Sequence, residues 1–144
     1  MSAHSPNTRP LNARPQCLIV DGSAMVRRVA ARIVRDIGFE AVEARTGREA
    51  LDAAQLRRPD AVLMDWVSGE MEAPELIAAL RGSDTSETPI RVVLCTADRR
   101  VERIEAALAA GADEYIMKPF DSDIIESKFR LTGLPVSRRA PFAA

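Results

Sequence analysis

The chain has 144 residues, of which 47% are hydrophobic and 28% are charged, and its formal net charge is -1 at pH 7. These values are typical of one globular domain that buries its core without a cofactor or a disulfide. No apolar run approaches the roughly 18 residues of a membrane span, and no apolar signal core precedes the first predicted strand. We therefore expect a cytoplasmic protein with no membrane insertion.

The acidic residues all lie between residues 17 and 132, whereas the two ends of the chain contain arginines and five of the nine prolines. An acidic body repels phosphates, so no DNA binding is expected. The composition of the ends predicts a disordered N-terminal arm over residues 1–16 and a flexible C-terminal tail over residues 133–144. The predicted folded body spans residues 17–132.

The body begins with a buried strand over residues 17–20 that stops at Asp21. The helix that follows has an apolar face repeating every three or four residues, and Gly38 ends it. The residues of this face are Val26, Val29, Ala30, Ile33, Val34 and Ile37. The strand contains Cys17, and a later strand contains the other cysteine, Cys95, so we expect two buried, reduced thiols.

A weak strand over residues 40–44 and a second helix come next. Thr46 and Glu49 have the spacing of a capping box, in which each side chain accepts a hydrogen bond from a backbone N–H of the other residue. The next strand, residues 61–64, is apolar throughout and stops at Asp65. Such a short apolar run favours a strand that is buried on both faces of a parallel sheet.

The middle of the chain continues with a loop over residues 66–73, in which we expect Trp66 to be partly exposed. Pro74 fits the first turn of a third helix, because its missing N–H is not needed there. A fourth strand over residues 90–95 stops at Thr96. This strand, like the earlier ones, is apolar and ends in a polar group.

The last third of the body contains a fourth helix, a strand over residues 115–117 that stops at Lys118, and a fifth helix capped by Asp121. The fourth helix is marked by Val101, Ile104 and Leu108, and the fifth turns Ile124, Ile125 and Phe129 inward. Five strands that alternate with five helices predict an α/β fold, a doubly wound (βα)5 domain with a parallel five-stranded sheet.

Four polar residues follow four of these strands: Asp21, Asp65, Thr96 and Lys118. The carboxyl ends of parallel strands share one edge of the sheet, so these side chains should converge there. A carboxylate can attack phosphorus if the incoming negative charge is neutralised. Asp21 and Asp65 could bind Mg²⁺, Lys118 could pair with a phosphoryl oxygen, and Thr96 could donate to another. Taken singly, each of the four would be better explained as a cap of a turn or a helix.

Four segments, residues 20–28, 64–66, 95–97 and 115–120, resemble the receiver domain of two-component response regulators, closest to the CheY-like chemotaxis type. The resemblance covers residues 17–132 and implies the flavodoxin-like strand order 2-1-3-4-5. It further implies a response regulator that signals by protein contact. With no segment after residue 132 long enough for an output domain, we expect a single-domain protein of a chemotaxis or motility pathway, with the flagellar motor as one candidate target.

The resemblance also implies roles for particular residues. Asp65 would accept a phosphoryl group from a sensor histidine kinase or a phosphotransfer protein. Thr96 and Tyr115 would be the switch pair, and Lys118 would precede a cis proline. The metal ligands for Mg²⁺ would be Asp21, Asp65 and the backbone carbonyl of Val67. The expected activity is that of a phosphoacceptor and not an enzyme, with at most slow self-dephosphorylation.

One departure from the family pattern concerns the metal site, because Gly22 stands where receivers usually have a second acid. Losing this carboxylate removes a ligand and a charge, so Mg²⁺ should bind more weakly. An alternative is therefore a pseudo-receiver that keeps the fold and its partner surface without useful phosphorylation. A phosphatase is less favoured, since Val67 stands where a general acid would be needed.

A further alternative is that arginines bind a cyclic dinucleotide, because clustered guanidinium groups grip phosphates and guanine faces. The residues concerned are Arg99, Arg100, Arg103, Arg138 and Arg139. A solvated helix face and a basic tail are the better explanation of these arginines. The output surface implied by the resemblance comprises residues 98–109, Tyr115 and residues 121–130.

Overall fold

A computed structural model describes residues 13–138. The main sheet has five parallel strands in the order β2-β1-β3-β6-β7, as the flavodoxin-like prediction requires. Its strands are β1 (Gln16–Val20), β2 (Glu40–Ala44), β3 (Ala61–Met64), β6 (Arg91–Thr96) and β7 (Glu114–Met117). The helices are α1 (Ala24–Asp36), α2 (Gly47–Leu56), α3 (Ala73–Gly82), α4 (Val101–Ala110) and α5 (Ser122–Leu131). The predicted fold class is confirmed.

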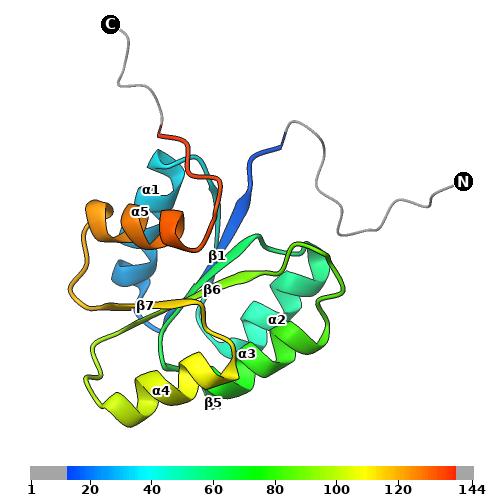
Figure 1. Cartoon of the computed structure of the whole chain (residues 1–144), viewed down its shortest axis with the longest axis vertical. Coiled ribbons are helices and arrows are strands. Elements are labelled where there is room, and N and C mark those ends of the chain that lie inside the picture. The colour runs from blue at the N-terminus through cyan, green and yellow to red at the C-terminus, as the bar shows by residue number, and fades with distance from the viewer. Residues whose placement is uncertain (1–12, 139–144) are drawn as a thin grey trace, which may run out of the picture.

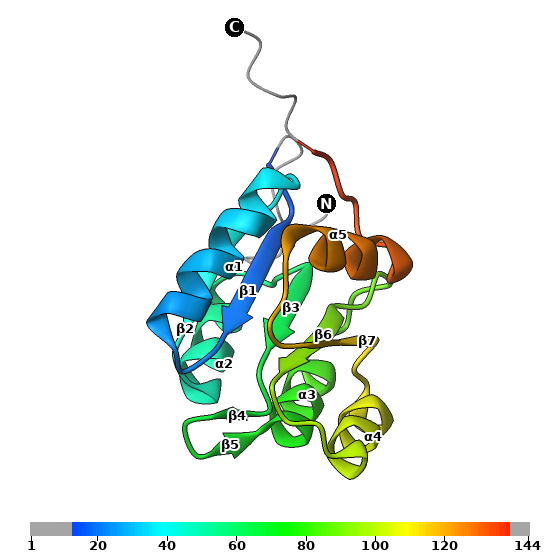
Figure 2. The ribbon, with the colours of Figure 1, turned by 90° about the vertical axis from the view of Figure 1, so that its left-hand side faces the viewer.

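Helices cover both faces of the sheet, α1 and α5 on one side and α2, α3 and α4 on the other (Figures 1 and 2). The strand residues alternate between two cores accordingly. Leu18 and Val20 of β1 pack with α2, α3 and α4, whereas Cys17 and Ile19 pack with α1 and α5. Both predicted thiols are free and buried. Burial raises the pKa of the Cys95 thiol to about 12, so it stays protonated at neutral pH.

Polar caps set the starts of several helices. Asp121 caps α5 as predicted, and Ser23, for which no cap was predicted, caps α1; each accepts a hydrogen bond from the N–H three residues later. Thr46 accepts from the Glu49 N–H, and Glu49 in turn accepts from the Arg45 N–H. The reciprocal arrangement at α2 therefore exists, shifted by one residue from the predicted capping box.

Two sequence expectations are wrong, one about exposure and one about secondary structure. Val29 was placed on the buried face of α1 but is 48% exposed, because Ala30, Ala31 and Val34 fill the contact with the sheet. The predicted loop after Asp65 instead forms a short antiparallel hairpin of β4 (Val67–Ser68) and β5 (Met71–Glu72). The hairpin lies at the carboxyl edge of the sheet, beside α3 (Figure 2).

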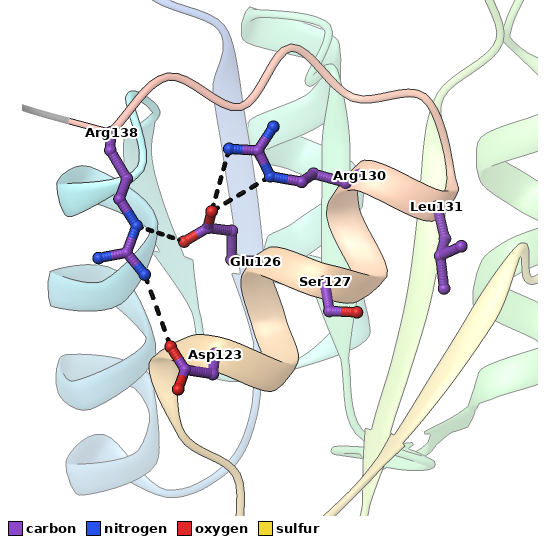
Figure 3. Close-up of a pocket in the computed structure, with 6 residues that line it drawn as sticks. All are labelled: Asp123, Glu126, Ser127, Arg130, Leu131 and Arg138. Atoms are coloured by element: carbon purple, nitrogen blue, oxygen red, sulfur yellow. Dashed lines mark hydrogen bonds and ion pairs between the residues drawn. The ribbon is translucent and has the colours of Figure 1, made fainter.

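The chain after α5 also differs from the prediction, since residues 133–138 pack against the body and do not form a flexible tail. Leu134 is buried in the α1–α5 core, and the Ser137 N–H donates to the Ile37 carbonyl at 2.8 Å. Arg138 reaches back over α5 to form ion pairs with Glu126 at 2.6 Å and Asp123 at 3.5 Å (Figure 3). Residues 139–144 lie outside the described residues, as do residues 1–12 of the predicted arm.

No helix between residues 13 and 138 combines the length and the apolar character needed to cross a membrane.

Candidate functional site

The register of the sheet brings the predicted site residues to one edge. Val20 pairs with Met64 and Met64 with Leu94, while Thr96 pairs with Met117. The polar residues Asp21, Asp65 and Lys118 come directly after three of these positions, and Thr96 is itself the last residue of β6. Convergence at the carboxyl edge is therefore confirmed by the geometry.

Lys118 joins the two carboxylates. Its Nζ donates to Asp21 Oδ2 at 2.7 Å and to Asp65 Oδ2 at 3.0 Å. The three side chains are 17%, 8% and 25% exposed for Lys118, Asp21 and Asp65 respectively, so the cluster is shielded and opens to solvent mainly at Asp65. Burial alone would lower the pKa of Lys118, but the hydrogen bonds and charges of the two aspartates outweigh it and raise the pKa. Lys118 is thus a cation held between two anions.

Backbone N–H groups hold the other oxygen of each carboxylate. Asp21 Oδ1 accepts from the Ser23 N–H at 2.9 Å, and Asp65 Oδ1 accepts from the Trp66 N–H at 2.7 Å. Each carboxylate is therefore fixed at both oxygens, one by the ammonium and one by the turn that follows its strand. The Lys118–Pro119 peptide bond is cis, as the resemblance implied.

Thr96 lies at the same edge and is 3% exposed. Its Oγ1 accepts from the Asp98 N–H at 3.1 Å, and its carbonyl accepts from the Lys118 N–H at 2.9 Å. A hydroxyl that accepts one hydrogen bond still has its own proton to donate. Thr96 is thus beside the lysine and able to donate to a new acceptor at this edge.

Tyr115 lies outside this cluster, with its ring 36% exposed on β7. Lys128 Nζ is 5.3 Å from the centroid of the ring and 3.0 Å from Glu114 Oε1, and the same Glu114 oxygen accepts from the Tyr115 N–H. Burial alone would raise the pKa of Glu114, but the Tyr115 N–H and Lys128 together lower it. The ring is therefore in an outward position, beside a cation from α5.

Trp66 is more buried than the sequence analysis predicts. It was expected to be partly exposed, yet it is 7% exposed and belongs to the core beneath α3. Its Nε1 donates to Glu72 Oε2 at 3.0 Å, and the Arg103 guanidinium lies 5.1 Å from its ring centroid. No local pattern could reveal this, because Arg103 comes from a helix far along the chain.

The metal ligands predicted from the sequence are only partly assembled. Asp21 and Asp65 lie together, and Mg²⁺ in proteins commonly uses one or two carboxylates with substrate oxygens and water, so their oxygens fit such an ion. Between residues 13 and 138 no group of three or more His, Cys, Asp or Glu side chains could hold a metal. A Cβ added at Gly22 would meet no atom within 4 Å, so the side chain missing there leaves open space. The role of the Val67 carbonyl stays a prediction.

The arginines proposed for a cyclic dinucleotide are not gathered in one place. Arg100 and Arg103 both pair with Asp98 at the start of α4, whereas Arg138 pairs with acids of α5. Figures 1 and 2 show α4 and the end of the described chain at opposite ends of the molecule. Arg139 lies outside the described residues. Arg100, Arg103 and Arg138 already have carboxylate partners, so their arrangement does not favour a nucleotide site.

The sequence matches the response regulator receiver domain over residues 17–130. The chain belongs to the response regulator receiver family. Two curated relatives are the transcriptional regulatory protein PrrA of Mycobacterium tuberculosis, 37% identical over 106 residues, and the regulatory protein AtoC of Escherichia coli, 40% identical over 113 residues.

The match to PrrA includes 74% of this chain but only 44% of PrrA. The match to AtoC includes 78% of this chain but only 24% of AtoC. Among solved structures, it resembles the Vibrio cholerae chemotaxis protein CheY4, with 27% identity, a TM-score of 0.76 and coverage of 83% of this chain and 99% of CheY4. A CheY-like receiver domain protein from Methanospirillum hungatei has 26% identity and a TM-score of 0.73, over 84% and 95% of the two chains.

Proposed function

We propose that this receiver accepts a phosphoryl group on Asp65 from a phosphohistidine of a sensor histidine kinase or a phosphotransfer protein, and passes the signal on by protein contact. The observation that carries the proposal is the Lys118 ammonium bound to both carboxylates, at 2.7 and 3.0 Å. A partly shielded cation beside the more exposed of two aspartates is suited to an incoming phosphoryl group.

In the proposed reaction, an oxygen of Asp65 attacks phosphorus while the phosphorus–nitrogen bond of the donor breaks and its electron pair stays with the imidazole. Lys118 remains protonated because its pKa is raised, so its charge is available to a phosphoryl oxygen throughout. Asp21 holds the ammonium from the other side and keeps it at the edge of the sheet. We propose no turnover beyond slow self-dephosphorylation.

The metal in this proposal is Mg²⁺, held by Asp21, Asp65 and the carbonyl of Val67. When bound, it would neutralise charge on the phosphoryl oxygens. Gly22 contributes no carboxylate, so we propose that this receiver binds the ion more weakly than a receiver with two adjacent acids would.

The proposed output is a contact through the face formed by α4, β7 and α5. Val101, Leu108 and Tyr115 are 59%, 40% and 36% exposed there, which gives a partner apolar surface to cover. Movement of Thr96 toward the phosphoryl group, together with inward rotation of Tyr115, would change the shape of this face. The likeness to CheY4 supports a chemotaxis or motility pathway, and a flagellar motor protein is the first target to test.

A second candidate function is that of a pseudo-receiver, and Gly22 is the observation that favours it. With two carboxylates instead of three, the site would bind the ion too weakly for useful phosphorylation, and the output face would stay in one state. The same fold and output face would then act without phosphorylation.

The two candidates are separated by incubating the full chain with acetyl phosphate and Mg²⁺ and measuring the intact mass. We expect an acid-labile gain of one phosphoryl group that disappears in Asp65→Asn. Asp52→Asn is the matched control, because Asp52 is an exposed carboxylate on α2, 64% exposed, and should leave the gain unchanged. A gain that appears only in Gly22→Asp would establish the pseudo-receiver, and no gain in either protein would overturn the phosphoacceptor proposal.

A further inference from the structure

Trp66 and Asp98 flank the phosphoacceptor edge on two sides. Trp66 follows Asp65 directly, and its N–H holds Asp65 Oδ1 at 2.7 Å. Asp98 comes two residues after Thr96, and its N–H holds Thr96 Oγ1 at 3.1 Å. Each therefore supplies a backbone donor to a residue of the proposed phosphorylation site. The two residues lie in separate loops, after β3 and after β6.

One side chain of α4 touches both of them. Arg103 Nη1 donates to Asp98 Oδ2 at 2.7 Å, while its guanidinium carbon is 5.1 Å from the centroid of the Trp66 ring. The indole Nε1–H of Trp66 donates a hydrogen bond to Glu72 Oε2 at 3.0 Å. A guanidinium can stack on an aromatic face and pair with a carboxylate at the same time. A lysine ammonium does this less well.

We infer that Arg103 is a positioning residue that couples the loop of the phosphoacceptor to α4. Given the proposed function, on which this rests, a change at Asp65 and Thr96 would reach the output face through the contacts of Arg103. The side chains of Arg103 and Asp98 are 31% and 17% exposed, so their contact is partly shielded from solvent but lies outside the buried core.

The coupling works through the Thr96 hydroxyl. If that hydroxyl turns toward a phosphoryl group on Asp65, the Asp98 N–H loses its acceptor. A part-buried N–H without a partner is costly, so the loop that carries Asp98 rearranges. Arg103 is bound to Asp98 and therefore moves relative to Trp66, and the first turn of α4 moves with it.

The neighbouring Arg100 provides a matched comparison. It also pairs with Asp98, at 2.9 Å, but it is 63% exposed, and the ring contact recorded for Trp66 is to Arg103. If the ion pair with Asp98 were all that mattered, the two arginines would be interchangeable. If the bridge to Trp66 matters, only Arg103 transmits the change.

The test needs no phosphorylation, because Trp66 is the only tryptophan and its indole N–H gives one resolved NMR signal. Thr96→Val removes the hydroxyl, and we expect it to shift the Trp66 indole signal in the full chain. The shift should fall by more than half when Arg103→Met is present and persist when Arg100→Met is present. An undiminished shift in Arg103→Met would overturn the inference.

A second measurement adds beryllium fluoride and Mg²⁺, which together mimic a phosphorylated aspartate. Amides of residues 101–110 should shift in the unmodified protein and in Arg100→Met, but by less than half as much in Arg103→Met. Signals around Asp65 should still shift in Arg103→Met, which shows that the variant is folded and binds the mimic. Absence of any response in the unmodified protein would count against the proposed function, while the Thr96→Val experiment would still decide the coupling.

Discussion

The helices α3 and α4 lie next to each other on the same face of the sheet, and each has ten residues, yet they are held in different ways. α3 buries Ala73, Leu76, Ile77 and Leu80, whereas α4 buries only Ala107. What holds the start of α4 is polar, the ion pairs of Asp98 with Arg100 and Arg103.

This difference indicates which helix can move. An element that buries little apolar surface opens or shifts at a small free-energy cost, whereas one with four buried side chains does not. α4 is also the helix that carries exposed Val101 and Leu108. The apolar residues of α4 are therefore available to the proposed contact surface, and its polar residues connect it to the loop that follows Thr96.

The largest expected effect concerns stability. Leu76→Ala in α3 should lower the free energy of unfolding by about 2–5 kcal/mol, because it leaves a cavity around a fully buried leucine. The same chemical change in α4, Leu108→Ala, should cost under about 1 kcal/mol, since this leucine is 40% exposed. Urea denaturation of both variants measures the two values. Equal costs would show that the contrast between the helices is false.

Hydrogen exchange should show the same contrast in the unmodified protein. We expect backbone amides in the middle of α4 to exchange faster than those of α3, by on the order of tenfold, because local opening of α4 exposes less apolar surface. Exchange followed by NMR at neutral pH gives the rates residue by residue. Slower exchange in α4 would contradict this account of how the helix is anchored.

The smallest effect is the response of the α4 cluster to acid. Hydrogen bonds from Arg100 lower the pKa of Asp98 from 3.8 to about 2, with a further contribution from Arg103. Because the folded-state pKa is the lower one, the stabilisation is complete above pH 3.8 and is lost as the pH falls toward 2. A carboxyl NMR titration measures the value, and Arg100→Met should raise it. An unchanged pKa in that variant would assign the shift to another cause.

Much of the site could be predicted because each of its polar residues directly follows or ends an apolar strand. The run that stops at Asp65 identified both a buried strand and a carboxylate at its end, and the parallel topology then required Asp21 and Lys118 to lie nearby. The pattern of residues gave the elements and the polar strand ends, whereas the strand order and the roles of the individual residues came from the resemblance to receiver domains.

The errors arose where the outcome depends on distant residues. Trp66 is buried in the core beneath α3 and also meets Arg103 of α4, and nothing adjacent to it in sequence signals this. Leu134 and Val136 are too few to form a periodic pattern, so their packing against the body could not be foreseen. Val29 fits the helical period of α1 but is left at the surface. Periodicity identifies apolar residues without showing which of them the fold covers.

The open space beside Gly22 separates two properties of this receiver, its fold and the strength of its proposed ion site. Since a Cβ at that position would meet no neighbouring atom, a lineage could acquire or discard an acid there without a steric change in its core or its strand order. The dependence of the proposed signalling on the cellular supply of divalent ions could then be adjusted by natural selection in a single substitution.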